Sequence, residues 1–115
     1  MLKKEARLTS TYEFNKTRRL GVSHSGEYSR VFSLQLKDPS LPTRTGIVVT
    51  NRFASSAVKR SRIKRIYRDI LRKEYSRMLP GFWIVVHPRD SFLEASHEEI
   101  SADLNSILQK TSVLR

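Results

Sequence analysis

The residues most able to do chemistry in this sequence are cations, and they are concentrated in one segment. Between Lys59 and Lys73 there are eight Lys and Arg residues and a single acid, Asp69. Like charges one helical turn apart repel each other, so pairing within the segment does not account for such a run. Guanidinium and ammonium groups gathered on one surface are typical of phosphate binding. The bases are Lys59, Arg60, Arg62, Lys64, Arg65, Arg68, Arg72 and Lys73.

A helical arrangement of this segment separates the charges from the apolar residues. At about 100° per residue, Arg65, Arg68 and Arg72 lie together with Ser61, opposite a stripe that contains Ile66. We therefore predict a helix that turns an apolar face to a sheet and a ridge of guanidinium groups to a nucleic acid. The plain alternative is a charged face that contacts only solvent.

Aromatic residues stand among further bases near the N-terminus. Tyr12 and Phe14 are interleaved with these bases, and Phe32 follows in a stretch that alternates as a strand does. Unpaired nucleobases stack on aromatic rings, so the pattern favours single-stranded RNA. Core burial is the alternative for each ring, because Phe32 shares a strand face with Leu34 and Leu36. The bases in question are Lys3, Lys4, Arg7, Lys16, Arg18 and Arg19.

Side chains suited to catalysis by the protein itself are few. The sequence has no Cys, so it offers no thiol nucleophile, no disulfide and no Cys-ligated zinc. None of His24, His87 and His97 has a second histidine three or four residues away, the spacing of a paired-histidine metal site on a helix. The acids between 88 and 108 show no two-metal pattern. A nuclease that uses these histidines with a lysine stays open as an alternative to a nucleic-acid-binding module.

Length and composition fit one domain over residues 1–115. The chain has 115 residues, 38% of them hydrophobic, and a formal net charge of +11, which a polyanionic partner explains. The longest apolar run, FWIVV at 82–86, is too short to cross a membrane. The N-terminus lacks the apolar run of a signal peptide. We therefore expect a soluble, cytoplasmic protein without a membrane partner.

Hydrophobic periodicity predicts three strands, at 30–37, 46–50 and 82–87. The last two are continuously apolar, as in strands that are covered on both faces. The turn-rich connection at 38–42 favours an antiparallel pair of the first two strands.

Three helices are expected around these strands. The long basic helix begins at Ser55 or Ser56 and ends before Pro80, and a C-terminal helix covers about 96–108. A short helix at about 10–16 is indicated by Ser10 followed three residues later by Glu13, a capping-box pattern. Parallel pairing of the strands around the long helix gives a β-α-β crossover in a mixed sheet.

One stretch of the chain resembles a known family. TGIVVTNRFASSAVKRSRIKRIYRDILRKEY at 45–75 is similar to the signature region of the bacterial ribonuclease P protein component. In that region a buried strand and a basic pair precede a helix that opens Ala-Val-x-Arg-Asn-Arg-x-x-Lys-Arg. Here Ala57-Val58 are followed by KRSRIKR and then by Arg68. The N-terminal Arg7-Leu8 and Phe14 also fall at family positions.

The resemblance implies a fold and a function. The fold is an α/β (α+β) two-layer sandwich with a mixed sheet of about four strands, three helices and a left-handed β-α-β crossover. The function is that of the non-catalytic protein subunit of an endoribonuclease. The subunit joins a catalytic RNA and binds the 5′ leader of precursor tRNA. The RNA and its Mg²⁺ ions cut the phosphodiester bond, and the protein holds no cofactor tightly.

The resemblance also assigns roles to residues of this chain. Phe14 and Phe32 match aromatic positions of a leader-binding cleft, and Arg18 stands where a second cleft aromatic is common. Ser61 replaces the usual Asn, Asn51 replaces the first base of the pair, and the loop at 53–56 is one residue longer and lacks its glycine. The bases expected to contact the catalytic RNA are Arg52, Lys59, Arg60, Arg62, Lys64, Arg65, Arg68 and Arg72.

Two other functions compete with this interpretation. One is a general RNA-binding or ribosome-associated module without a role in cleavage. The other is the free-standing nuclease that uses His24, His87 or His97. Cleavage of precursor tRNA with and without the cognate RNA separates the three.

Overall fold

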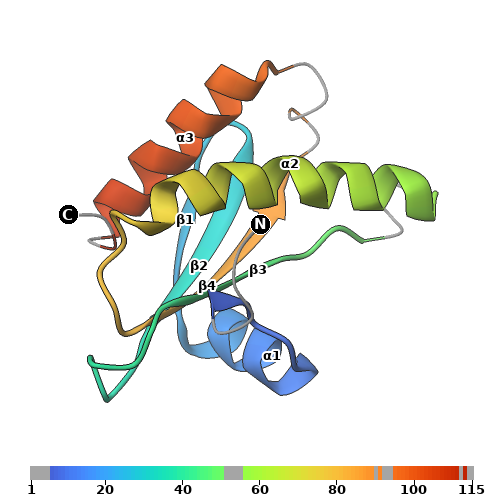
Figure 1. The fold of residues 1–115 in the computed structure, drawn as a ribbon. Coiled ribbons are helices and arrows are strands. Elements are labelled where there is room, and N and C mark those ends of the chain that lie inside the picture. Colours follow the sequence, from blue (N-terminus) through green and yellow to red (C-terminus); the bar gives the residue numbers. More distant parts are fainter. Residues whose placement is uncertain (1–5, 51–55, 90, 92–94, 112, 114–115) are drawn as a thin grey trace.

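Three helices and four strands make up the described part of the chain. The computed structural model describes residues 6–50, 56–89, 91, 95–111 and 113. Figure 1 shows the sheet between two groups of helices, with α2 and α3 on one side and α1 on the other. The elements are α1 (Thr11–Leu20), β1 (Val22–Ser25), β2 (Ser29–Gln35), β3 (Arg44–Ile47), α2 (Ala57–Tyr75), β4 (Phe82–Pro88) and α3 (His97–Lys110).

The sheet has the strand order β1-β2-β4-β3. β1 pairs with β2 and β2 pairs with β4 in antiparallel fashion, whereas β3 and β4 are parallel and are connected through α2. The predicted α+β fold with a mixed four-stranded sheet, three helices and a β-α-β crossover is therefore confirmed.

The predicted antiparallel pair of the strands at 30–37 and 46–50 is wrong, because β4 lies between them. Ile84, Val85 and Val86 of β4 have no exposed surface. A strand that is apolar on both faces is best placed in the middle of a sheet, where helices cover both faces and both edges are paired.

The strand β1 and the start of β3 also differ from the prediction. β1 was not anticipated, since its sequence VSHS lacks both apolar alternation and β-branched enrichment apart from Val22. β3 begins at Arg44 rather than at 46, because its backbone pairs with Trp83 to Val86 of β4. In both cases pairing with a neighbouring strand determines which residues form the strand, and the local sequence does not contain that partner.

The main core lies between the sheet and the pair α2 and α3. Each of these two helices contributes four buried residues, which recur at helical spacing along one side of the helix. Ile66 is only half-buried. The core residues of these helices are Ile63, Tyr67, Ile70, Leu71, Ile100, Leu104, Ile107 and Leu108.

The two faces of β2 are reversed from what their hydrophobicity suggests. Ser29, Val31 and Ser33 are buried, whereas Phe32 and Leu34 on the other face are half-buried. The small serines leave room for Tyr67, whose hydroxyl oxygen lies 2.7 Å from Oγ of Ser29. The hydrogen bond satisfies both buried hydroxyl groups, so this polar face packs against the helices at little cost.

Serine side chains cap all three helices. Ser10 and Glu13 form the predicted capping box of α1, and Ser96 and Glu99 form another at α3. Ser56, one of two predicted candidates, accepts a hydrogen bond from the amide of Lys59 at the start of α2. None of these helices combines the length and the hydrophobicity that a membrane span requires.

Candidate nucleic-acid interface

The side of α2 that faces away from the core carries the predicted ridge of bases. Ser61, Arg65 and Arg72 are exposed and Arg68 is half-buried, so the helix turns them outward as the spacing predicts. At the start of the ridge lies a shallow pocket of about 330 Å³. Ala57, Val58, Ser61, Arg62 and Arg65 line this pocket.

Asp69 divides the ridge into two parts. Its carboxylate lies 3.0 Å from Nη2 of Arg72 and 3.3 Å from Nζ of Lys73. Hydrogen bonds from Arg72 and then Lys73 hold the pKa of Asp69 below its ordinary value. Nε2 of His97, at the start of α3, lies 3.4 Å from the same carboxylate. The C-terminal part of the ridge is thus compensated by the protein's own acid.

The N-terminal part of the ridge is not compensated in this way. Five of its bases form no ion pair with a described residue, and we refer to them as the unpaired cations. They are Lys59, Arg62, Lys64, Arg65 and Arg68. Arg60 is half-buried on the flank of the helix, and Arg52 lies outside the described residues.

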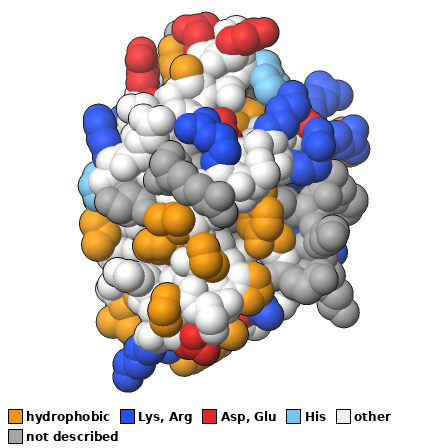
Figure 2. All heavy atoms as spheres, turned by 60° about the vertical axis from the view of Figure 1, so that its left-hand side comes forward, with side chains coloured by type: hydrophobic (Ala, Val, Ile, Leu, Met, Phe, Trp, Pro, Cys, Tyr) orange, Lys and Arg blue, Asp and Glu red, His pale blue; other side chains and the backbone are white. Residues whose placement is uncertain are grey.

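Acidic and basic side chains gather in different places on the face of the molecule that Figure 2 shows. Figure 2 shows acidic side chains at the top of the molecule, the level at which α3 begins in Figure 1. Lys and Arg side chains gather on one side below them, and hydrophobic side chains predominate further down. This separation leaves a surface of net positive charge, which attracts phosphate groups.

The second candidate surface lies on the opposite face of the sheet, beside α1. Phe14 of α1 packs on Gly46 of β3, where an added Cβ would lie 2.4 Å from two ring atoms. Glu13, one position earlier, lies 3.0 Å from Nη1 of Arg44. Burial would raise the pKa of Glu13, but hydrogen bonds from Thr9 and Ser10 and the charge of Arg44 outweigh it and lower that pKa. These contacts fix α1 on the sheet.

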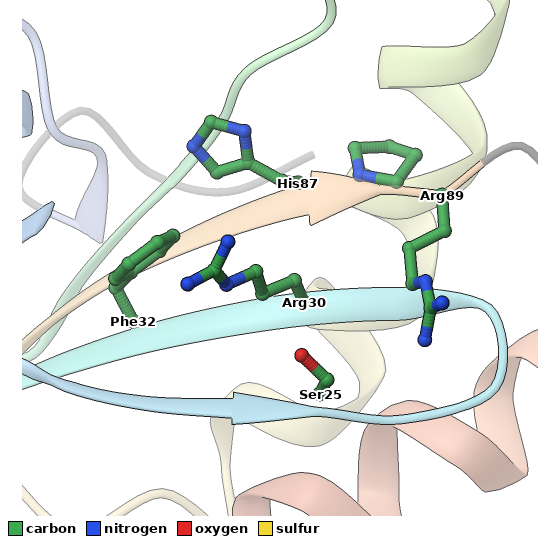
Figure 3. Close-up of a pocket in the computed structure, with 6 residues that line it drawn as sticks. Ser25, Arg30, Phe32, His87 and Arg89 are labelled. Atoms are coloured by element: carbon green, nitrogen blue, oxygen red, sulfur yellow. The ribbon is translucent and has the colours of Figure 1, made fainter.

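A pocket of about 390 Å³ opens on this same sheet face, and we refer to it as the sheet pocket. Figure 3 shows its lining side chains, which come from β1, β2, β4 and the residue that follows β4. The Phe32 and His87 rings meet edge to face with centroids 5.5 Å apart, and the guanidinium carbon of Arg30 lies 4.9 Å from the Phe32 ring centre. The lining residues are Ser25, Arg30, Phe32, His87, Pro88 and Arg89.

The sheet pocket settles where the predicted leader residues lie. Phe32 lines the pocket and is not a core residue. Arg18 of α1 is close enough that its charge acts on His87: burial, and then the charges of Arg18 and Arg30, lower the pKa of His87. Phe14 is one turn before Arg18 on the same sheet face, although it does not line the pocket.

Sequence reasoning missed Arg30 and Arg89 as site residues and considered His87 only as a catalytic group. Arg30 and His87 are directly opposite each other across β2 and β4. Only the register of β2 against β4 brings these two residues together, and the prediction did not pair these two strands. Arg89 is held by hydrogen bonds to the carbonyl oxygens of Gly26 and Tyr28 in the β1–β2 turn.

The three histidines do not form one site. His24 is paired across the strands with Val31, whose side chain is in the core, so it lies on the sheet face opposite to His87. His97 lies at the start of α3 against Asp69. Within the described ranges, no three His, Asp or Glu side chains are placed to hold a metal ion.

Comparisons with known proteins all point to one family. A family model described as ribonuclease P matches residues 2–112. The ribonuclease P protein component of Finegoldia magna is 30% identical over 109 residues, covering 95% of this chain and 93% of the relative. That of a Pseudanabaena species is 32% identical over 114 residues, covering 99% and 97%. The solved RNase P protein of Thermotoga maritima superimposes with a TM-score of 0.78 at 29% identity, covering 90% of this chain and 96% of that one.

Proposed function

The chain belongs to the bacterial ribonuclease P protein component family, and from this premise we propose that it binds a catalytic RNA and the 5′ leader of precursor tRNA. In this role it promotes endonucleolytic removal of the leader and so the 5′ maturation of tRNA. We assign the hydrolysis to the RNA and to Mg²⁺ ions bound with it. We further propose the cytoplasm as the compartment of the complex.

The observation that carries the proposal is the set of unpaired cations on α2. Side chains that have no acidic partner among the described residues are available for phosphate groups, and releasing counterions from a folded RNA makes such contacts favourable. Arg62 and Arg65 flank Ser61 in the shallow pocket, which lets a backbone phosphate approach the helix closely. The three arginines among these cations favour bidentate phosphate contacts.

The sheet face beside α1 supports leader binding. Phe32 offers an aromatic ring for stacking, and Arg18, Arg30 and Arg89 surround it with positive charge. Single-stranded RNA is bound by this combination of stacking and phosphate contacts. The two surfaces use different faces of the molecule, so one protein can contact the catalytic RNA and the leader together.

Reconstitution of the holoenzyme tests the proposal directly. Precursor tRNA is incubated with the cognate RNA alone, the protein alone, and both together at low Mg²⁺. We expect the protein to stimulate cleavage by the RNA and to cut nothing alone. Binding without stimulation would favour a general RNA-binding module, and cleavage by the protein alone would favour the nuclease that uses histidines.

Matched arginine variants test the docking surface. Arg65→Ala or Arg68→Ala removes an unpaired cation, and we expect each to weaken association with the catalytic RNA by about fivefold to tenfold while the thermal melt is unchanged. Arg77→Ala is the control, because Arg77 is already paired with Glu74 at 3.4 Å. An equal effect of the control would contradict a localised docking surface.

A third experiment tests the leader site. Phe14→Ala should weaken binding of precursor tRNA to the holoenzyme more than binding of mature tRNA, since only the precursor carries the leader. Tyr12→Ala is the matched control, because Tyr12 is 64% exposed on another side of the same helix. Equal losses for precursor and mature tRNA would show that the ring has no role in leader binding.

A further inference from the structure

The sheet pocket has the surfaces that one unpaired nucleotide requires. Its volume of about 390 Å³ is within the range of roughly 300–1,000 Å³ found for ligand pockets. Phe32 and Pro88 provide flat apolar surfaces, and Arg30 and Arg89 provide positive charge. A base can stack on the first pair while the flanking phosphates contact the second.

His87 is the residue of this pocket whose hydrogen bonding is incomplete. Its Nε2 atom is buried and has no hydrogen-bond partner in the described part of the chain. Buried polar atoms are nearly always hydrogen-bonded, so one that is not needs an explanation. The ring is held edge to face against Phe32, so the imidazole lies beside the surface on which a base would stack.

Arg30 occupies part of this surface in the free protein. Its guanidinium carbon lies 4.9 Å from the centre of the Phe32 ring, and Figure 3 shows the group between Phe32 and the middle of the pocket. Nε of Arg30 donates to Oγ of Ser23 at 3.0 Å. A base that stacks on Phe32 therefore displaces an exposed cation–π contact and leaves the guanidinium next to its own phosphate.

The charge state of His87 distinguishes base contact from phosphate contact. Burial and the positive charges of Arg18 on α1 and Arg30 on β2 lower the pKa of His87 below its ordinary value, which favours the neutral ring. A neutral imidazole has one donor and one acceptor nitrogen. It adds nothing to phosphate binding by charge, but it matches the donors and acceptors on the edge of a nucleobase.

We propose that His87 is a specificity-determining residue, which reads the edge of one unpaired leader base stacked on Phe32 while Arg30 and Arg89 bind the flanking phosphates. The inference rests on the proposed function, because it takes the leader of precursor tRNA as the occupant. It goes further by assigning base selection to one side chain. The contacted base can be located, because the base preference at only one leader position should depend on His87.

The experiment uses the holoenzyme and a set of precursor tRNAs that differ at one leader position at a time. Dissociation constants are measured for all four bases at each position. With the unchanged protein we expect one position at which one base binds about tenfold more tightly than the worst. His87→Ala should reduce that difference to about twofold or less and leave the affinity for the disfavoured bases unchanged.

Two further variants separate base reading from other roles. Arg89→Ala should weaken all leaders by a similar factor and keep the base preference, as expected for a phosphate contact. His87→Gln keeps a donor and an acceptor, so we expect a preference for one leader base over the others to survive. This variant also tests the inference if His87→Ala fails to fold. Thermal melts of all variants verify folding.

Each alternative outcome overturns the inference. Loss of affinity for all four bases alike after His87→Ala would make His87 a structural or phosphate-contacting residue. Equal binding of all leaders by the unchanged protein would show that there is no base preference for His87 to determine. Equal binding of precursor and mature tRNA would instead contradict the proposed leader site itself, and a parallel titration with mature tRNA distinguishes this result.

Discussion

The ring of Phe14 rests directly on the backbone of Gly46, so close that a Cβ at position 46 would lie 2.4 Å from Cε1 and Cζ of the ring. This contact joins the first helix of the chain to the edge strand of the sheet. It also sets the position of the helix that carries Arg18 toward the sheet pocket. The fold and the proposed leader site therefore depend on the same glycine.

Gly46→Ala should force Phe14 away from the sheet. Inserting a methyl group into a well-packed contact costs about 1–3 kcal/mol, and we expect a loss of that size in the free energy of unfolding. Because α1 moves with its phenylalanine, affinity of the holoenzyme for precursor tRNA should fall as well. Chemical denaturation and a binding titration measure the two effects.

A double-mutant cycle with Phe14→Ala identifies the cause. If the Phe14 ring is what the new methyl group meets, Gly46→Ala should cost less in the Phe14→Ala background, with a coupling energy of at least about 0.5 kcal/mol. Strictly additive costs would mean that Gly46 is required for some other reason.

The buried hydroxyl of Tyr67 provides a second prediction. Tyr67→Phe leaves Oγ of Ser29 without its 2.7 Å partner in a part of the core that has no exposed surface, so unfolding should become easier by about 1–3 kcal/mol. Urea denaturation with an unchanged slope measures this. Tyr12→Phe is the control, and its exposed hydroxyl predicts no measurable change. A stability loss in the control equal to that of Tyr67→Phe would contradict a role for burial.

Tyr67 should also make the protein sensitive to alkali. Burial raises its pKa from about 10 to about 12. Above pH 10 the unfolded chain releases the phenolic proton while the folded chain retains it, so stability falls as the pH rises through this window. The stability advantage over Tyr67→Phe should therefore shrink between pH 10 and pH 12. A constant difference would show that the hydroxyl titrates alike in both states.

Much of the fold could be predicted from the sequence, because much of it is encoded locally. Ser10 and Glu13 predicted a cap from two side chains three residues apart, and the inward stripe of α2 follows from a helical period that any segment carries in itself. The pairing of β2 with β4 could not be obtained in this way. It depends on which strand is buried on both sides, and that is a property of the whole sheet.

The candidate site divides in the same manner. The ridge of α2 was predictable, since its bases lie on one helix and their spacing fixes their directions. The sheet pocket was not, because Arg30 and His87 become neighbours only through the register of two strands about 50 residues apart. Phe32 shows the limit most clearly: its strand alternates correctly, but hydrophobicity alone pointed to the wrong face as the buried one.

In the proposed complex, Asp69 limits the number of cations that contact the catalytic RNA, and the salt dependence of binding measures that number. Each phosphate contact contributes a slope of about −0.9 to the plot of log affinity against log salt, so the five unpaired cations predict a slope of roughly −4 to −5. Asp69→Asn removes the charge that holds Arg72 and Lys73 at 3.0 Å and 3.3 Å. The slope should then become steeper by about one to two, with tighter binding at low salt. Arg65→Ala should make it shallower by about one, and Arg77→Ala should leave it unchanged because Glu74 keeps that guanidinium paired. An identical slope for all three variants would mean that the RNA binds elsewhere on the protein.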